Sequence, residues 1–235
     1  MKFEDRYARN KKTLSDEDQQ KLATSCVAIV GCGGLGGYIA EQLARIGVGK
    51  IVLFDGDRFE ASNLNRQIMA TELNIGQWKV EAALDRLQSV NSEVQVEAVR
   101  AWFEEHKAPD LLQKVDLVCD ALDSRDSRVM LERVCHRMEL PLVYASIAGW
   151  FGQIGVSLPG DFSVSRLFGS GKKGVESTWG NPAFTPAVLA SLSVAETVKC
   201  LVGREPSLRH AWLQVDLLTM EFERFEIQTK VKESV

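Results

Sequence analysis

Apolar and polar residues follow two alternating patterns along the chain. Continuous apolar runs, typical of strands that are buried on both faces, span 26–31, 50–55, 116–122 and 142–147. Between them, apolar residues recur at helical spacing over 35–46, 79–90, 125–138 and 186–201. Strands that alternate with helices predict an α/β fold with a Rossmann-like, doubly wound and mainly parallel sheet.

Weaker patterns complete the predicted sheet. Residues 94–99 alternate between apolar and polar positions, as a half-buried strand does, and a further strand is predicted at 153–158. Two strands over 213–218 and 221–227, joined by a turn, predict antiparallel C-terminal strands within 208–227.

The remaining segments are polar. Residues 1–25 predict an N-terminal helical arm, with Ser15 as the N-cap of a helix and Asp18 favouring its start. A short helix is predicted at 110–114. Residues 159–185 are rich in Gly, Ser, Lys and Asn and predict a mobile crossover loop, either a lid or a channel for a partner segment. With no repeat and no change of composition, residues 1–235 predict a single domain.

A glycine cluster follows the first apolar run. Gly31, Gly33 and Gly34 precede the helix at 35–46, and Asp55 ends the next run. Strand, glycine turn, helix, strand and acid occur in the order of a dinucleotide-type unit, in which backbone amides at a helix N-terminus face phosphates. Asp55 is placed to accept hydrogen bonds from ribose hydroxyls. This pattern predicts an adenine nucleotide without saying which one.

The second apolar run leads into a long polar connection at 57–76, a length that is usually functional inside a compact domain. The connection contains two candidate anion ligands, Arg58 and Arg66, and the amide side chains of Asn63 and Asn65.

Two more candidates follow this connection. Lys79 opens a helix, where a lysine opposes the helix dipole and a nearby phosphate would give it a role. Asp123 follows the strand at 116–122 and is therefore expected at the same sheet edge as Asp55. Hydride transfer needs neither a group of phosphate-facing cations nor a metal-type carboxylate, whereas adenylation needs both.

Charge and composition exclude several classes of protein. A net charge of −4 and a pI near 5.5 do not suggest a nucleic-acid surface. No run approaches the roughly 18 apolar residues of a membrane span, and the charged N-terminus does not resemble a secretory signal, so a cytoplasmic protein is expected. The five cysteines form no CxxC pair and are expected to be buried and reduced.

Four motifs stand in order along the chain: GCGGLG (31–36), DGDRFEASNLNRQ (55–67), IGQWK (75–79) and DALDS (120–124). Together they resemble the ThiF/MoeB/HesA family, the bacterial relatives of ubiquitin-activating enzymes. RYAR (6–9), GWFGQIGVSLPG (149–160) and the helix at 186–201 extend the resemblance over nearly the whole chain. The resemblance implies a single ThiF-type adenylation domain.

The resemblance also implies an activity and its partners. Members adenylate the C-terminal glycine carboxylate of a small ubiquitin-like sulfur carrier, of the ThiS or MoaD type ending in Gly-Gly, and release pyrophosphate. ATP and Mg²⁺ are the implied cofactors. A homodimer is implied because Arg9 matches an arginine that reaches the γ-phosphate from the neighbouring subunit.

Roles for the site residues follow from the same resemblance. Arg9, Arg66, Lys79 and Asp123 are the implied catalytic residues, with Asp123 as the Mg²⁺ ligand. The implied nucleotide-binding set is Gly31, Gly33, Gly34, Asp55, Asp57, Asn63, Arg66, Gln67 and Lys79.

The chain departs from the family mildly at Asp123-Ser124, where the family motif often has DN, and more clearly in its cysteines. Many members carry two CxxC pairs that bind zinc, and their absence here predicts no zinc. Many also carry a cysteine in the crossover loop that receives the carrier, and residues 159–185 contain none. We therefore expect adenylation only, with sulfur delivered by another protein and Cys200 in a packing role.

Three alternatives remain open. Relatives use adenylation to cyclise a carbamoylated adenosine in tRNA, although the acidic charge disfavours a tRNA substrate. A non-catalytic carrier-binding subunit is a second alternative, disfavoured by the presence of Arg9, Arg66, Lys79 and Asp123 together. An NAD-dependent dehydrogenase is the third.

Overall fold

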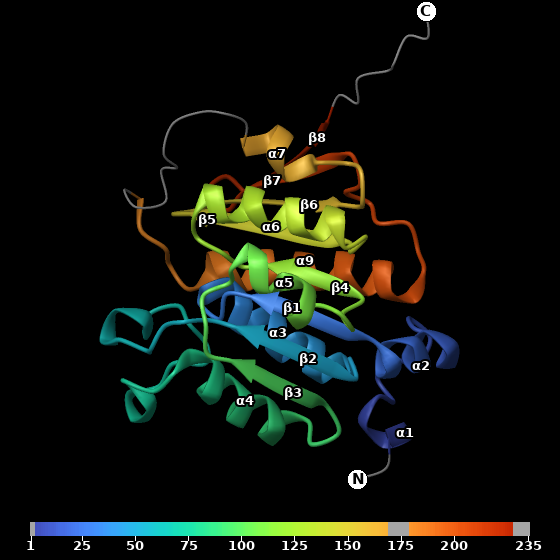
Figure 1. The fold of residues 1–235 in the computed structure, drawn as a ribbon, viewed down its shortest axis with the longest axis vertical. Coiled ribbons are helices and arrows are strands. Elements are labelled where there is room, and N and C mark those ends of the chain that lie inside the picture. The colour runs from blue at the N-terminus through green and yellow to red at the C-terminus, as the bar shows by residue number, and fades with distance from the viewer. Residues whose placement is uncertain (1–2, 169–178, 228–235) are drawn as a thin grey trace, which may run out of the picture.

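The computed structural model describes residues 3–168 and 179–227, which include an eight-stranded mixed sheet (Figure 1). Its strands, in sheet order, are β3 (Gln95–Val99), β2 (Lys50–Phe54), β1 (Cys26–Val30), β4 (Leu117–Asp120), β5 (Leu142–Ala148), β6 (Phe151–Ser157), β7 (Ala211–Asp216) and β8 (Glu221–Glu226). Neighbours from β3 to β5 are parallel, and the pairs from β5 to β8 are antiparallel. The predicted fold class is therefore confirmed.

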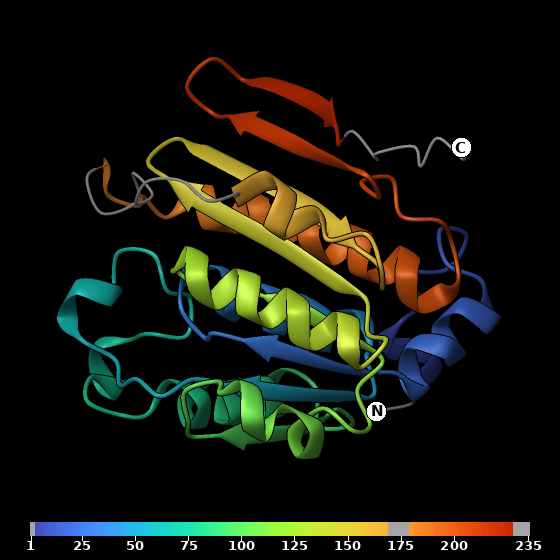
Figure 2. The ribbon, with the colours of Figure 1, turned by 45° about the horizontal axis from the view of Figure 1, so that its top comes forward.

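Helices cover both faces of the sheet (Figure 2). The helices are α1 (Phe3–Arg6), α2 (Asp16–Thr24), α3 (Gly34–Ile46), α4 (Lys79–Val90), α5 (Ala108–Leu111), α6 (Arg125–Arg137), α7 (Ser163–Phe168) and α9 (Phe184–Val202). Helices α3, α4 and α9 pack on one face, and α6 and α7 on the other.

Two apolar clusters form the core because successive side chains of a strand point to opposite faces. In β1, Val27 and Ile29 join the cluster that includes Leu43 of α3. Ala28 and Val30 join the cluster on the other face, together with α6. All five β1 residues are buried, as its continuous apolar run predicts.

Helix α3 lies very close to the end of β1. A Cβ atom on Gly36 would overlap the carbonyl oxygen of Gly31, and one on Gly31 would lie 2.5 Å from the carbonyl oxygen of Ala121. The glycine cluster thus lets α3 start directly above the carboxyl ends of β1 and β4.

Three predicted segments differ from the structure. The short helix expected at 110–114 lies at Ala108–Leu111, because Pro109 favours the first helical turn. The polar connection at 57–76 holds two 3₁₀ helices, η1 (Ala61–Asn63) and η2 (Glu72–Asn74). The expected loop at 159–185 contains α7 and the first residues of α9. Residues 169–178, in the centre of that expected loop, lie outside the described residues.

Helix α7 forms through a tertiary contact. The carboxylate of Glu132, on α6, accepts hydrogen bonds from the backbone amides of Val164 (2.7 Å) and Ser165 (2.8 Å). It also accepts one from the hydroxyl of Ser157 at 2.7 Å. A buried carboxylate therefore satisfies amides at the start of α7 that have no partner within that helix.

Helix α9 reaches the length and apolar composition of a membrane span, with a mean hydropathy of 1.3, contrary to the expectation that no such run exists. Half of this segment is buried inside the protein, where it packs against α3, β5 and β6. Its apolar face packs against other elements of the fold, as in the core helix of a globular domain.

The N-terminal arm lies at the amino ends of the parallel strands. Tyr7 packs beside Gly47, just before β2, and its hydroxyl accepts a hydrogen bond from Asn91 at 2.8 Å. Ser15 caps α2 as predicted: its hydroxyl accepts from the Asp18 amide, and the Asp18 carboxylate accepts from the Ser15 amide, both at 3.0 Å.

This cap generates a stability prediction. Ser15→Ala removes the acceptor of one otherwise unsatisfied amide and should lower the free energy of unfolding by about 1 kcal/mol. Ser89→Ala, which removes an exposed hydroxyl bonded to the Arg86 carbonyl, is the control and should change it by less than about 0.5 kcal/mol. Urea unfolding followed by circular dichroism measures both. Equal effects of the two variants would contradict the assigned cap.

Candidate active site

A cleft of about 290 Å³ lies at the carboxyl ends of the parallel strands. Among its described lining residues are Gly31, Gly33, Gly34, Asp55, Asp57, Asn63, Arg66, Gln67, Lys79 and Asp123. These come from the loops after β1, β2 and β4 and from the start of α4. Apart from Arg9 and the candidates Arg58 and Asn65, the structure brings the predicted site residues to this cleft, which is where open α/β sheets bind ligands.

The N-terminus of α3 forms the floor of the cleft. Its N-cap is Gly33, which offers no side-chain oxygen, and its first turn holds no acidic residue. The first-turn amides have no acceptor within the helix, and the helix dipole gives this end partial positive charge. The floor is therefore suited to an anion such as a phosphate.

Asp55 is held rigidly at the end of β2. One carboxylate oxygen accepts a hydrogen bond from the Cys32 amide at 2.7 Å, and the other accepts from the Asp57 amide at 2.8 Å. Each carboxylate oxygen has two lone pairs, so acceptor capacity remains after these bonds. A fixed carboxylate with remaining acceptors is suited to two neighbouring hydroxyls, as on a ribose.

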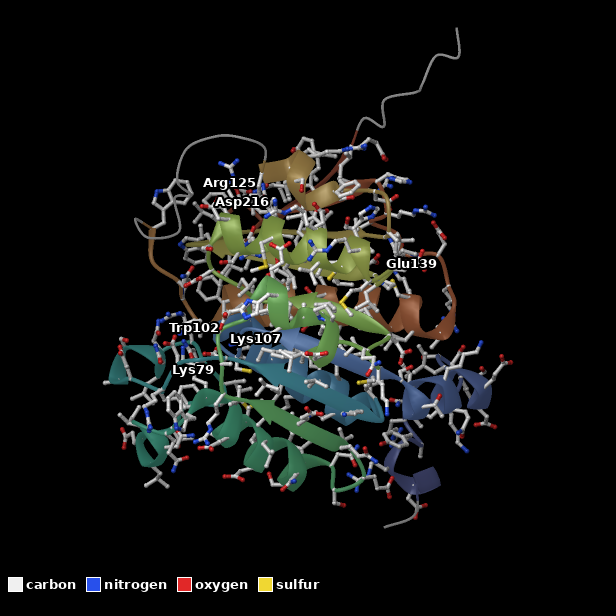
Figure 3. All side chains as sticks on the ribbon, viewed as in Figure 1. Lys79, Trp102, Lys107, Arg125, Glu139 and Asp216 are labelled. Atoms are coloured by element: carbon white, nitrogen blue, oxygen red, sulfur yellow. The ribbon has the colours of Figure 1, made fainter. Side chains whose placement is uncertain are left out.

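Lys79 is buried, and its ammonium lies 3.0 Å from the Asp57 carboxylate. Its backbone amide also donates to the Asp57 carbonyl at 3.0 Å. This ion pair explains why a lysine is tolerated in the first turn of α4. In Figure 3, Lys79 lies at the side of the molecule where β2 ends.

The connection after β2 supplies Arg66, Asn63 and Gln67. The Arg66 guanidinium donates to the Ser62 carbonyl at 3.0 Å and to Asn65 Oδ1 at 2.9 Å. Asn63 uses its Oδ1 to accept from the Glu60 amide at 3.0 Å, so it also holds η1 in place.

Gln67 is nearly fully buried, and its Oε1 has no hydrogen-bond partner among the described residues. Buried polar atoms are rarely left unsatisfied, so this atom points to a donor supplied by a ligand.

Asp123 lines the cleft, whereas two other candidates, Arg9 and Arg58, lie outside it. Asp123 is exposed and makes no ion pair within the described part of the chain. Arg9 is exposed on the N-terminal arm, at the opposite edge of the sheet from the cleft. Arg58, expected as an anion ligand, instead donates to the Gly76 carbonyl at 2.6 Å and stacks on Trp78, because its side chain points away from the cleft.

The sequence analysis missed Trp102, Arg128 and Asn181, which also line the cleft. Trp102 follows β3, so the rule that sites form at the carboxyl ends of strands could have found it. Arg128 lies within α6 without any distinguishing motif, and Asn181 lies in a segment of little periodicity.

Arg128 and Asp120 form a buried ion pair beneath the cleft. The Arg128 guanidinium lies 3.1 Å from Asp120 Oδ2 and 2.5 Å from the Ala145 carbonyl, and it also donates to the Leu122 carbonyl. Burial raises the pKa of Asp120, and Arg128 opposes that rise. The pair links β4, β5 and α6 where the loop carrying Asp123 begins.

No group of three potential metal-ligating His, Cys, Asp or Glu side chains occurs among residues 3–168 and 179–227. Mg²⁺ is commonly held by one or two carboxylates together with substrate phosphates, and Asp123 at the cleft fits that donor set.

The cysteine thiols are poorly suited to chemistry. Burial raises the pKa of Cys119 to about 12 and that of Cys26 and Cys200 to about 11. Cys32 is buried beside the cleft, where burial and then Asp55 raise its pKa well above the usual value. Thiols with raised pKa values are weak nucleophiles at neutral pH.

Comparisons with known proteins give matches over nearly the whole chain. A sequence model of the ThiF family matches residues 7–234. The SAMP-activating enzyme E1 of Haloferax volcanii is 30% identical over 231 residues, which cover 96% of this chain and 86% of that protein. The molybdopterin-synthase adenylyltransferase of Haemophilus influenzae is 29% identical over 228 residues, covering 94% and 93%.

A third relative is the sulfur carrier protein adenylyltransferase of Thermus thermophilus, 32% identical with 95% of this chain and 87% of that protein covered. Among solved structures, E. coli MccB with ATP aligns with a TM-score of 0.81 at 24% identity, over 96% of this chain and 72% of that one. This structural likeness establishes a shared fold.

The buried ion pair generates a second stability prediction. Arg128→Met leaves Asp120 charged and unpaired in the core and should lower the free energy of unfolding by about 3–5 kcal/mol. Arg133→Met, on the same helix but exposed and 4.0 Å from Glu105, is the matched control and should cost less than about 1 kcal/mol. Chemical denaturation measures both. Similar losses in the two variants would contradict a structural role for the pair.

Proposed function

The chain belongs to the ThiF family, and from this premise we propose that it is an ATP-dependent adenylyltransferase. Its substrate is the C-terminal glycine carboxylate of a ubiquitin-like sulfur carrier, which it converts to an acyl-adenylate. The observation that carries the proposal is the single cleft that gathers Asp55, Arg66, Lys79 and Asp123 beside the uncapped N-terminus of α3. The names of the three relatives above support the same class of reaction.

The reaction needs positioning and charge stabilisation more than acid–base groups. A terminal carboxylate has a pKa near ~3.5 and is already ionised at neutral pH. One of its oxygens attacks the α-phosphorus of ATP, a new oxygen–phosphorus bond forms, and the bond to the β-phosphate breaks to release pyrophosphate. No proton has to be removed. Accordingly, no His, Ser or Cys occurs among the described residues that line the cleft.

We assign the residues as follows. Asp55 binds the ribose hydroxyls with its remaining acceptor capacity. The amides of Gly33, the N-cap of α3, and of Gly34, its first residue, face the phosphates. Arg66 and Lys79 offset the negative charge that shifts onto the departing pyrophosphate.

Asp123 fits as the protein ligand of Mg²⁺. When bound, that ion neutralises phosphate charge and orients phosphate oxygens. Lys79 leaves Asp57 or shares its charge when phosphates enter, because one ammonium offers three donors.

The burial of the cysteine thiols and their raised pKa values support adenylation without a thioester step. Cys32, the thiol nearest the cleft, is fully enclosed and has a raised pKa. The other cysteines are buried or partly buried, and none lines the cleft among the described residues. We therefore propose that another protein delivers the sulfur to the activated carrier.

The test is ATP–pyrophosphate exchange with purified protein and a panel of carriers that end in Gly-Gly. Exchange that depends on one carrier is expected. Asp123→Ala should abolish it without loss of folding, whereas Asp126→Ala, which removes a neighbouring exposed carboxylate on α6, should retain it. Exchange that survives Asp123→Ala at normal Mg²⁺ would refute the assigned role. ATP binding without exchange by any carrier would instead favour a non-catalytic binding subunit or another acceptor.

We also propose that the enzyme is a homodimer in which Arg9 completes the site of the partner. Its position, at the edge of the sheet opposite to the cleft, supports a contribution to another subunit. Arg9→Ala and Asp123→Ala should each be inactive alone. Purified heterodimers of the two variants should recover activity, because one of their two sites is then intact. Differently tagged, co-expressed chains allow this measurement, with the Asp123→Ala homodimer as control, and heterodimers without activity would contradict a shared site.

A further inference from the structure

Trp102 has no role in the chemistry assigned above, yet it stands in the wall of the cleft. Its side chain is 62% exposed, and it is the only aromatic residue among the described lining residues. It follows the end of β3 at Val99 and lies on the same side of the molecule as Lys79 (Figure 3).

The orientation of the indole follows from its contact with Gly56. A Cβ atom built on Gly56 would lie 2.8 Å from Cε2 and 2.9 Å from both Cδ2 and Nε1 of Trp102. Nearly equal distances to three atoms around the five-membered ring place Gly56 over a face of the indole, not at its edge. Only glycine permits this approach. One face of the ring therefore rests on the backbone of Gly56, and the residue as a whole remains 62% exposed.

The indole lies next to the proposed ribose site, because Trp102 and Asp55 line the same cleft. Gly56 directly follows Asp55, whose carboxylate is held by the Cys32 and Asp57 amides. The base of a nucleotide is joined to its ribose by one bond, so it must lie within a few ångströms of the residue that binds the ribose. The apolar side chains of Leu35, Leu122 and Ile147 also line this cleft.

We propose that Trp102 is the stacking platform for the adenine base of ATP. This inference rests on the proposed function, because it takes Asp55 as the ribose ligand. It goes further by naming the residue that recognises the base. Stacking does not distinguish one base from another, because every base has a π-face. Trp102 therefore contributes affinity for the nucleoside part of ATP and does not discriminate between purines.

The alternative role for Trp102 is to cover Gly56. That role predicts that removing the indole loosens the loop and weakens every ligand of the cleft alike. Stacking predicts a loss confined to ligands that carry a base. Nucleotide and base-free probes therefore separate the two roles.

The experiment compares the binding of ATP, AMP and inorganic tripolyphosphate by isothermal titration calorimetry. Trp102→Ala should weaken ATP and AMP by a similar factor, about 5- to 100-fold, and leave tripolyphosphate unchanged. Trp102→Phe, which keeps a smaller aromatic face, should retain much of the affinity for both nucleotides. Trp150→Ala, which removes another exposed tryptophan outside the cleft lining, is the matched control and should bind all three probes normally.

Fluorescence gives a second readout that does not depend on the alanine variant. AMP should quench the tryptophan emission of the unaltered protein, and this quenching should be largely lost in Trp102→Phe but kept in Trp150→Phe. Nucleotide affinity that is unchanged by Trp102→Ala, equal loss of tripolyphosphate binding, or quenching that persists in Trp102→Phe would each overturn the proposal.

The outcomes distinguish this inference from the proposed function. Base-dependent binding through Trp102 without any pyrophosphate exchange would support the platform and reject the adenylyltransferase. Carrier-dependent exchange with unaltered nucleotide affinity in Trp102→Ala would reject the platform alone.

Discussion

The close approach of α3 to the end of β1 is the constraint on which the candidate site depends. A side chain on Gly36 would overlap the Gly31 carbonyl, and one on Gly31 would clash with the Ala121 carbonyl. This contact brings the unsatisfied amides of α3 to the sheet edge where β1, β2 and β4 end. Without it, the cluster of cations and carboxylates would face no fixed anion-binding floor.

Charge balance around the cleft is the second organising feature. Lys79 is paired with Asp57, and Arg128 with Asp120, so two of the three cations among the described lining residues already have carboxylate partners. The Arg128 pair is buried and also bonded to two carbonyl groups, which suits a structural role. Lys79 and Arg66 are held by weaker interactions than Arg128, because Asp57 is half-exposed and the acceptors of Arg66 are neutral. An incoming triphosphate thus meets cations that can change partners at low cost.

The structure also separates side chains that are available to a ligand from side chains that hold other parts of the protein in place. Asn63, which belongs to the motif DGDRFEASNLNRQ, uses its side-chain oxygen to hold η1, and the carboxylate of Glu132 binds the start of α7. Trp102, absent from every motif, is exposed in the wall of the cleft. Membership in a motif and availability to a ligand are therefore different properties, and the second is visible only in three dimensions.

Local patterns in the sequence determined the strand and helix order, the Ser15 cap, the glycine turn and the candidates Asp55, Arg66, Lys79 and Asp123. Each depends on residues near in sequence: apolar periodicity, a capping spacing, or a position just after a strand. The tertiary structure alone decided that Arg58 turns away onto Trp78, that α7 forms on Glu132, and that Arg128 pairs with Asp120. These features depend on partners that are distant in sequence or on which way a side chain leaves a loop, and no local pattern encodes either.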